Sequence, residues 1–267
     1  MCLVNNSGSL FLDNRITQGG VAMLYAASLV TVTLVLTVLG VSALGPTAGE
    51  LPVLALAIPA LWLLPQSGVA GWLLLCGLGA YGAMLPEQPL ALSISLFMML
   101  PILIICTSAK GCWQLGALMV SIVLSMNVGL MALQGEGKLE GSISATLIQI
   151  AAIGVIWYAA RCWRPIGGNT WWPLFAVFSL WLGGMEAAAL VALCVTGLIA
   201  ALQSLAKMQH QDWIPRLACV LPAIGFTTLV VLPQFSVANP ILVSWLLVLG
   251  GGLLGESLLD DPEEEDE

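Results

Sequence analysis

The chain has 267 residues, of which 59% are hydrophobic and only 8% are charged. Soluble domains carry about 25% charged residues, so a soluble protein this apolar could not cover its own surface with polar groups. The composition therefore excludes an ordinary soluble domain and predicts a polytopic membrane protein whose main solvent is the lipid bilayer.

The net charge of −8 is concentrated at one end of the chain. Residues 256–267 read ESLLDDPEEEDE and hold eight acids and no base, while the preceding residues balance seven acids against seven bases. A run of like charges this dense predicts a disordered, solvated tail. The sequence offers no basic cluster of the kind that binds nucleic acid.

The chain divides into a lead-in, a membrane bundle and the acidic tail. Residues 1–20 are expected to form a cytoplasmic or interfacial lead-in, since they lack the compact apolar core and cleavage site of a signal peptide. Residues 21–255 are expected to form an all-α transmembrane bundle of about ten spans. The apolar stretches expected to cross are 21–44, 51–64, 69–85, 90–106, 113–133, 142–160, 171–182, the run that follows Gly184 up to Ala206, 217–232 and 239–254.

Glycine and proline mark the places where this apolar sequence is expected to turn. Residues 170–206 would form one helix some 55 Å long, whereas the hydrocarbon core is about 30 Å thick. The stretch must therefore cross twice and turn at Gly183-Gly184, which leaves its first crossing short. An earlier short crossing, which contains Pro59, is expected to end at the turn PQSG of residues 65–68.

The basic residues predict the orientation of the bundle. With ten crossings and a cytoplasmic N-terminus, six of the seven bases fall on the cytoplasmic side. The six are Arg15, Lys110, Arg161, Arg164, Lys207 and Arg216. Lys138 alone falls outside, between Glu136 and Glu140. Both termini are therefore predicted to be cytoplasmic, in a bacterial inner membrane.

The polar segment QGEGKLEG at residues 134–141 separates two groups of five stretches, 21–133 and 142–255. Because five is odd, the second group would enter the membrane in the opposite orientation. That arrangement is the inverted repeat of many secondary transporters. The two groups show no residue-level similarity, so the repeat is inferred from the number of stretches and from the short, proline- or glycine-interrupted stretches at corresponding positions, the second and the seventh.

The expected spans lack the residues that intramembrane catalysis needs. The only histidine, His210, lies in a loop, so no span can hold a Ser–His dyad or an H-E-x-x-H zinc motif. Seven cysteines are scattered without metal-ligand spacing. Neutral groups such as Ser93 and Gln149 could support hydrogen bonds but not a proton pathway. We expect no enzymatic activity, no metal and no cofactor.

Glu186 is the single carboxylate within the expected spans. It follows the turn Gly183-Gly184, and short or interrupted spans of this kind often carry the substrate site of a transporter. Together with Pro59 and Asn127, the most polar interior side chain of the fifth stretch, these residues are the candidate substrate-binding residues. Glu186 has two interpretations: an interfacial carboxylate, or a buried one that lines a polar cavity between the second, seventh and eighth stretches.

Two functions are consistent with this sequence. A permease that moves a small solute by alternating access is favoured by the five-plus-five division. The alternative is a non-catalytic membrane subunit or scaffold of a larger complex, which short loops, glycine-rich helix faces and the acidic tail would suit. The expected partners are the lipid bilayer and, in the second case, other membrane subunits that contact the helix faces or the tail.

Overall fold

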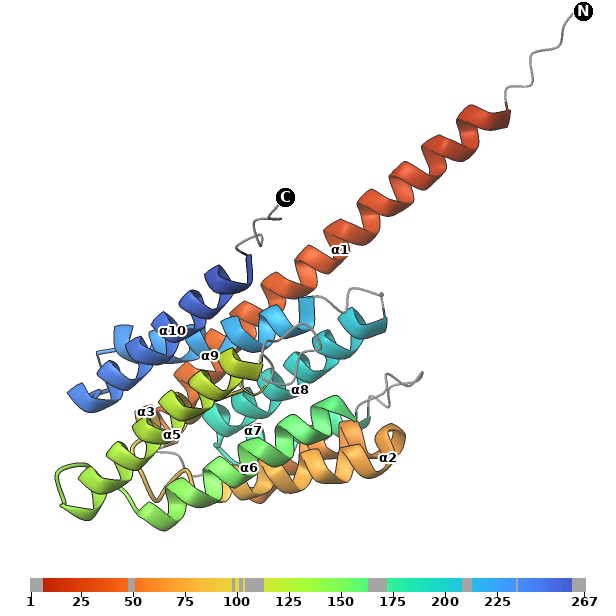
Figure 1. The fold of residues 1–267 in the computed structure, drawn as a ribbon. Coiled ribbons are helices and arrows are strands. Elements are labelled where there is room, and N and C mark those ends of the chain that lie inside the picture. Colours follow the sequence, from red (N-terminus) through yellow and green to blue (C-terminus); the bar gives the residue numbers. More distant parts are fainter. Residues whose placement is uncertain are drawn as a thin grey trace, which may run out of the picture.

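The structure is a computed structural model. It describes residues 7–47, 51–97, 99–100, 103, 113–162, 172–207, 213–233 and 235–260. Within these ranges the chain forms helices and no strands, which confirms the predicted all-α class. The helices pack side by side as a bundle, and α1 projects beyond the others at its N-terminal end (Figure 1).

The helices follow one another with short connections. They are α1 (Ser7–Leu44), α2 (Val53–Ala83), α3 (Leu90–Leu96), α5 (Trp113–Gly135), α6 (Ile143–Arg161), the 3₁₀ helix η1 (Trp172–Leu174), α7 (Phe175–Leu182), α8 (Glu186–Lys207), α9 (Trp213–Val231) and α10 (Asn239–Asp260). In the described part of the chain, three helical stretches are long and apolar enough to cross a membrane: Met23–Leu44, Ala117–Gly135 and Glu186–Leu205. Shorter apolar helices of 10–17 residues accompany them.

Helix α2 is folded back on itself at Gly68. The backbone there has φ 55° and ψ −137°, a conformation that favours glycine. A Cβ placed on Gly82 would lie 3.2 Å from Leu56 Cδ1, although a straight helix would separate these residues by about 39 Å. The first half of α2 (residues 53–67) and its second half (69–83) therefore lie antiparallel, in agreement with the turn expected at residues 65–68.

Helices α1 and α8 form one closely packed antiparallel pair. A Cβ on Gly197 of α8 would lie 2.8 Å from Leu36 Cδ1 of α1. Further toward the start of α1, Ala26 packs in one cluster with Leu205 of α8. The two helices therefore run in opposite directions. The absent side chain of Gly197 lets the two helices approach closely.

The second half of α2 and α6 form another antiparallel pair. A Cβ on Gly77 would lie 2.7 Å from Ile156 Cγ1, and Leu74 packs with Ala159 in one cluster. Here too a glycine stands where a side chain would collide with the facing helix. The bundle therefore holds two pairs in which a glycine mediates close contact.

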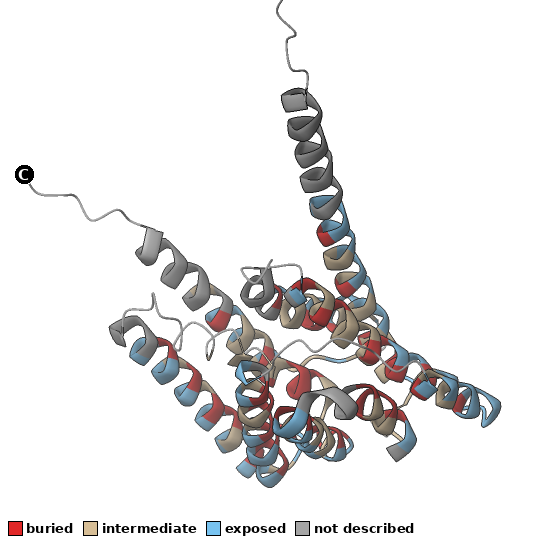
Figure 2. Cartoon of the chain, turned by 90° about the vertical axis from the view of Figure 1, so that its right-hand side faces the viewer, coloured by how far each residue is buried: buried red, intermediate tan, exposed pale blue. Residues whose placement is uncertain are grey.

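The remaining helices pack around α3 and α9. Phe226 of α9 shares a cluster with Val41 of α1 and Ile94 of α3. Val123 of α5 packs against Val248 of α10. Buried residues line the inner faces of the helices while exposed ones line the outer faces (Figure 2). Large apolar side chains are among the exposed ones, for example Leu24, Trp72, Phe175 and Val231, as expected of a bundle surrounded by lipid.

The two ends of the bundle differ in the loops that they carry. The loops 84–89, 136–142 and 183–185 lie at one end, which we name the Lys138 end (Figure 1). The turn at Gly68, Arg161 at the end of α6 and Lys207 at the end of α8 lie at the other, which we name the Lys207 end. The start of α1 and the end of α10 also lie at the Lys207 end (Figure 1).

Two helices are longer than the sequence indicated. Helix α1 begins at Ser7, within the expected lead-in 1–20, because no proline interrupts residues 7–44. Helix α10 continues to Asp260, into the expected tail 256–267. Residues 261–267 of that tail lie outside the described residues.

Candidate functional site

The turn between α7 and α8 places Glu186 on the outside of the bundle. Gly184 has φ +73°, and the N–H groups of Gly184 and Met185 donate to Trp181 O at 3.0 Å and Leu180 O at 3.1 Å, which closes α7. Gly183, Gly184 and Glu186 are all exposed. The carboxylate thus stands in the first turn of α8 at the Lys138 end, the position of its interfacial interpretation.

The helices that correspond to the second, seventh and eighth stretches do pack together, but through hydrocarbon. Ile58 of α2 and Leu180 of α7 are fully buried in one apolar cluster with alanines of α8. Pro59 is buried in the same half of α2. The structure therefore differs from the hypothesis of a polar cavity at this place, because the facing positions are apolar and Glu186 lies outside the cluster.

Neutralising Glu186 is expected to have little effect. Surface substitutions usually change the free energy of unfolding by less than about 0.5 kcal/mol, and we expect Glu186→Gln and Glu186→Leu to stay within that range in detergent. Thermal melting of the purified variants measures it. A loss above about 2 kcal/mol for either variant would show that the side chain makes contacts that an exposed position does not provide.

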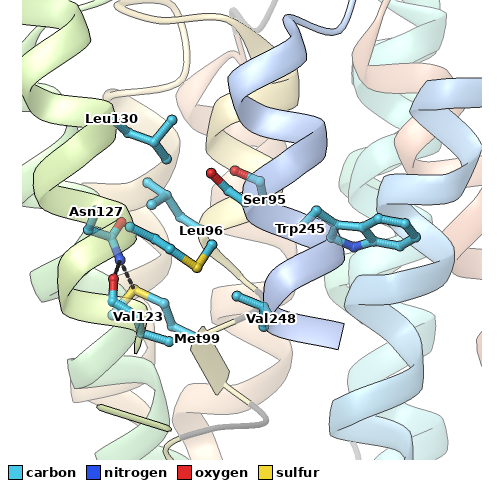
Figure 3. A pocket seen from close by; sticks show the side chains of 10 residues that line it. Ser95, Leu96, Met99, Val123, Asn127, Leu130, Trp245 and Val248 are labelled. Carbon is cyan, nitrogen blue, oxygen red and sulfur yellow. Dashed lines mark hydrogen bonds between the residues drawn. The ribbon is translucent and has the colours of Figure 1, made fainter. Parts of the chain in front are cut away.

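Asn127 lines a small cavity between α3, α5 and α10 (Figure 3). The cavity measures about 30 Å³, enough for one or two ordered waters and far below the roughly 300–1,000 Å³ of small-molecule sites. The Asn127 amide donates to Val123 O at 2.9 Å and approaches Met99 Sδ at 3.8 Å. The structure therefore does not bring Asn127 together with Glu186, which lies at the turn before α8.

The wall of this cavity is neutral. It combines the Asn127 amide with the hydroxyls of Ser95 and Ser244, which donate to Leu92 O and Pro240 O of their own helices at 2.7 Å each. None of the residues that line it is ionisable. Such a wall suits water or an uncharged solute, because an ion would lose its hydration without a compensating charge.

A second polar group, which the sequence did not single out, lies at the Lys138 end. We name it the glutamine cluster. Its members are Gln88 in the loop 84–89, Ser93 of α3, Gln134 of α5, and Thr146 and Gln149 of α6. Each is at most 7% exposed.

Hydrogen bonds connect these five side chains across four segments of the chain. The Gln88 amide donates to Gln149 Oε1 and, at 3.2 Å, to Ser93 Oγ. The Gln149 amide donates to Ser93 Oγ at 3.2 Å. The Thr146 hydroxyl lies 2.9 Å from Gln88 Oε1 and 3.1 Å from Gln134 Oε1. The Gln134 amide nitrogen is buried without a partner among the described residues.

The sequence did hold a signal for the glutamine cluster. Gln88 and Gln134 follow the third and fifth expected stretches, and the predicted topology puts the ends of both on the same side of the membrane. Ser93 and Gln149 were visible only as isolated polar residues. Their convergence depends on which helices become neighbours, and an apolar sequence carries little information about that.

Comparison with protein-family models, with curated proteins and with solved structures finds no match to this chain. The described residues also bring no three His, Cys, Asp or Glu side chains together in a group that could hold a metal ion. Function must therefore be inferred from the chain's own geometry.

Proposed function

We propose that this chain is a permease of the bacterial inner membrane, which crosses the bilayer ten times and moves a small uncharged solute by alternating access. Its two halves of five crossings would be related as an inverted repeat. The observation that carries this proposal is a close helix contact that occurs twice in the bundle, at the same spacing in the sequence.

The repeated contact joins a glycine to a branched side chain. Gly77 of α2 approaches Ile156 of α6, and Gly197 of α8 approaches Leu36 of α1. Gly197 stands 120 positions after Gly77, and Ile156 stands 120 positions after Leu36. The sequences GLGA at 77–80 and GLIA at 197–200 agree at three of four positions. This short match at the spacing of the two contacts supports the proposed repeat.

The same correspondence extends to the other helices. In the proposed repeat, α1 corresponds to α6, the first half of α2 to α7, the second half of α2 to α8, α3 to α9, and α5 to α10. The packing of α1 on α8 is then the counterpart of the packing of α6 on the second half of α2. The pairs α5 with α10 and α3 with α9 would each be their own counterpart, and both are in contact. A two-fold relation between the halves accounts for all four pairs.

Charge supports the proposed orientation. Four of the six bases that were predicted to be cytoplasmic lie in described helices: Arg15 near the start of α1, Arg161 at the end of α6, Lys207 at the end of α8 and Arg216 near the start of α9. These helix ends share one end of the bundle (Figure 1). Lys138 stands at the other end and forms an exposed ion pair with Glu136 at 2.6 Å. The positive-inside rule then assigns the Lys207 end to the cytoplasm, and both termini with it.

The cavity beside Asn127 is the proposed solute site. It lies between α5 and α10, which correspond to each other in the repeat, and transporters with inverted repeats bind their substrates at the interface of the halves. Its neutral wall favours an uncharged solute. Because the cavity has room for only one or two waters, the halves would have to separate before a solute could enter.

The test is two-sided labelling of one residue in this cavity. In a chain whose seven native cysteines are replaced by alanine, Ser244→Cys should react with a membrane-impermeant thiol reagent added to either side of inverted or right-side-out vesicles. Alternating access requires both reactions. A membrane subunit or scaffold without a pathway would protect this cysteine from both sides, and that result would refute the permease.

A further inference from the structure

The glutamine cluster lies between the cavity and the Lys138 end. On α5, Gln134 follows the cavity residue Leu130 by four positions, about one helical turn. On α3, Ser93 precedes the cavity residue Ser95. A solute that moved from the cavity toward the Lys138 end along these two helices would therefore meet the cluster.

The repeat-related positions at the Lys207 end are apolar. With the spacing of 120 positions, Thr146 corresponds to Ala26 and Gln149 corresponds to Leu29. Ala26 and Leu29 pack at the Lys207 end in a cluster with Leu205, which is fully buried. At these corresponding positions the described residues therefore differ: side chains joined by hydrogen bonds near the Lys138 end and hydrocarbon packing near the Lys207 end.

We propose that the glutamine cluster is the outer latch of the permease: its hydrogen bonds hold the loop 84–89, the end of α5 and α6 together while the pathway is closed to the outside, and they separate when it opens. This inference rests on the proposed function. Bonds between neutral side chains suit a reversible latch, because water replaces them on opening and the net cost of breaking each is modest. A buried ion pair would be harder to separate.

Two features of the closed latch fit this role. The Gln134 amide is buried without a described partner, so opening to water would satisfy a group that closure leaves unpaired. Gly141, in the loop before α6, has φ +113°, and a Cβ there would lie 2.8 Å from Gln88 Cβ and 3.0 Å from Gln134 Nε2. Closure therefore depends on the missing side chain of Gly141.

The experiment uses the full chain with the reporter Ser244→Cys. The double variant Thr146→Ala/Gln149→Leu replaces latch residues with those at the corresponding positions of the other end. Gly141→Ala opposes closure but keeps every hydrogen-bonding group. Both should speed labelling from the outside about tenfold and slow labelling from the cytoplasmic side. Thr196→Val is the matched control, since its buried hydroxyl donates only to Ala192 O of its own helix, at 2.7 Å.

The outcomes separate the latch from the permease. The latch would be overturned if the rate of labelling from the outside stayed unchanged in Gly141→Ala, or if it rose equally in Thr196→Val. Labelling of the reporter from both sides would still support the permease in either case. A reporter that is protected from both sides in every variant would overturn both. If the double variant does not accumulate in the membrane, the labelling rates of Gly141→Ala alone test the latch.

Discussion

Replacing Phe226 with alanine is expected to lower the free energy of unfolding in detergent by about 3–5 kcal/mol. Phe226 is fully buried, and its ring stacks on that of Trp245 with 4.8 Å between the ring centroids. The same cluster includes Val41 of α1 and Ile94 of α3. Truncation would leave a void where four helices meet, and the helices could fill it only by moving.

The matched control for Phe226→Ala is Phe178→Ala on α7. Phe178 also faces an aromatic ring, that of Trp181 at 6.0 Å between centroids, but its side chain is exposed. Its loss should cost less than about 1 kcal/mol. Thermal melting of the two purified variants measures the difference. Equal melting temperatures would mean that Phe226 is not packed as the structure shows.

The helices and turns of this chain could largely be predicted, because glycine and proline interrupt an otherwise apolar sequence. The turn at Gly68 and the turn at Gly183-Gly184 were both foreseen in this way. The ends of α1 and α10 were not, since helix formation continues past the apolar stretch wherever no proline stops it. The number of membrane crossings and their sidedness remain predictions.

The neighbours of each helix could not be predicted. In a soluble helix the polar face marks the outside, but here both faces are apolar. Leu24 is exposed and Ala26 is fully buried, yet nothing in the sequence around them distinguishes the two faces. The proposed correspondence between the halves rests on the contacts of Gly77 and Gly197, which indicate which positions to compare.

The candidate site shows the same limit. Glu186 drew attention because it is charged, and the structure places it on the surface. The buried polar groups of the glutamine cluster are neutral amides and hydroxyls that four segments of the chain contribute. Gln134 had been assigned to the polar segment 134–141, whereas it lies in the last turn of α5 and is 7% exposed. A polar residue is buried when it faces a neighbouring helix, and the sequence does not show which helices are neighbours.

Gly77→Ala is expected to lower the free energy of unfolding by about 1–3 kcal/mol, the usual cost of overpacking. The new methyl group would lie 2.7 Å from Ile156 Cγ1 and 3.2 Å from the backbone oxygen of Ala152. The backbone atom cannot turn aside, so α2 and α6 would have to separate. Alanine's better helix propensity, up to about 1 kcal/mol, offsets only part of this cost.

Two further glycines make this prediction specific. A Cβ on Gly79 would meet no atom within 4 Å, so Gly79→Ala should be neutral or slightly stabilising. In Gly197→Ala the methyl group would lie 2.8 Å from Leu36 Cδ1, the end of a flexible side chain, so the loss of free energy of unfolding should fall between those of the other two variants.

Ile156→Ala should restore part of the stability that Gly77→Ala loses, because it removes the atom that collides. Melting temperatures in the order Gly79→Ala, Gly197→Ala, Gly77→Ala, from highest to lowest, would support the two glycine contacts on which the proposed repeat rests. If Gly77→Ala melted as high as Gly79→Ala, the contact between α2 and α6 would be looser than described, and the repeat would lose its main support.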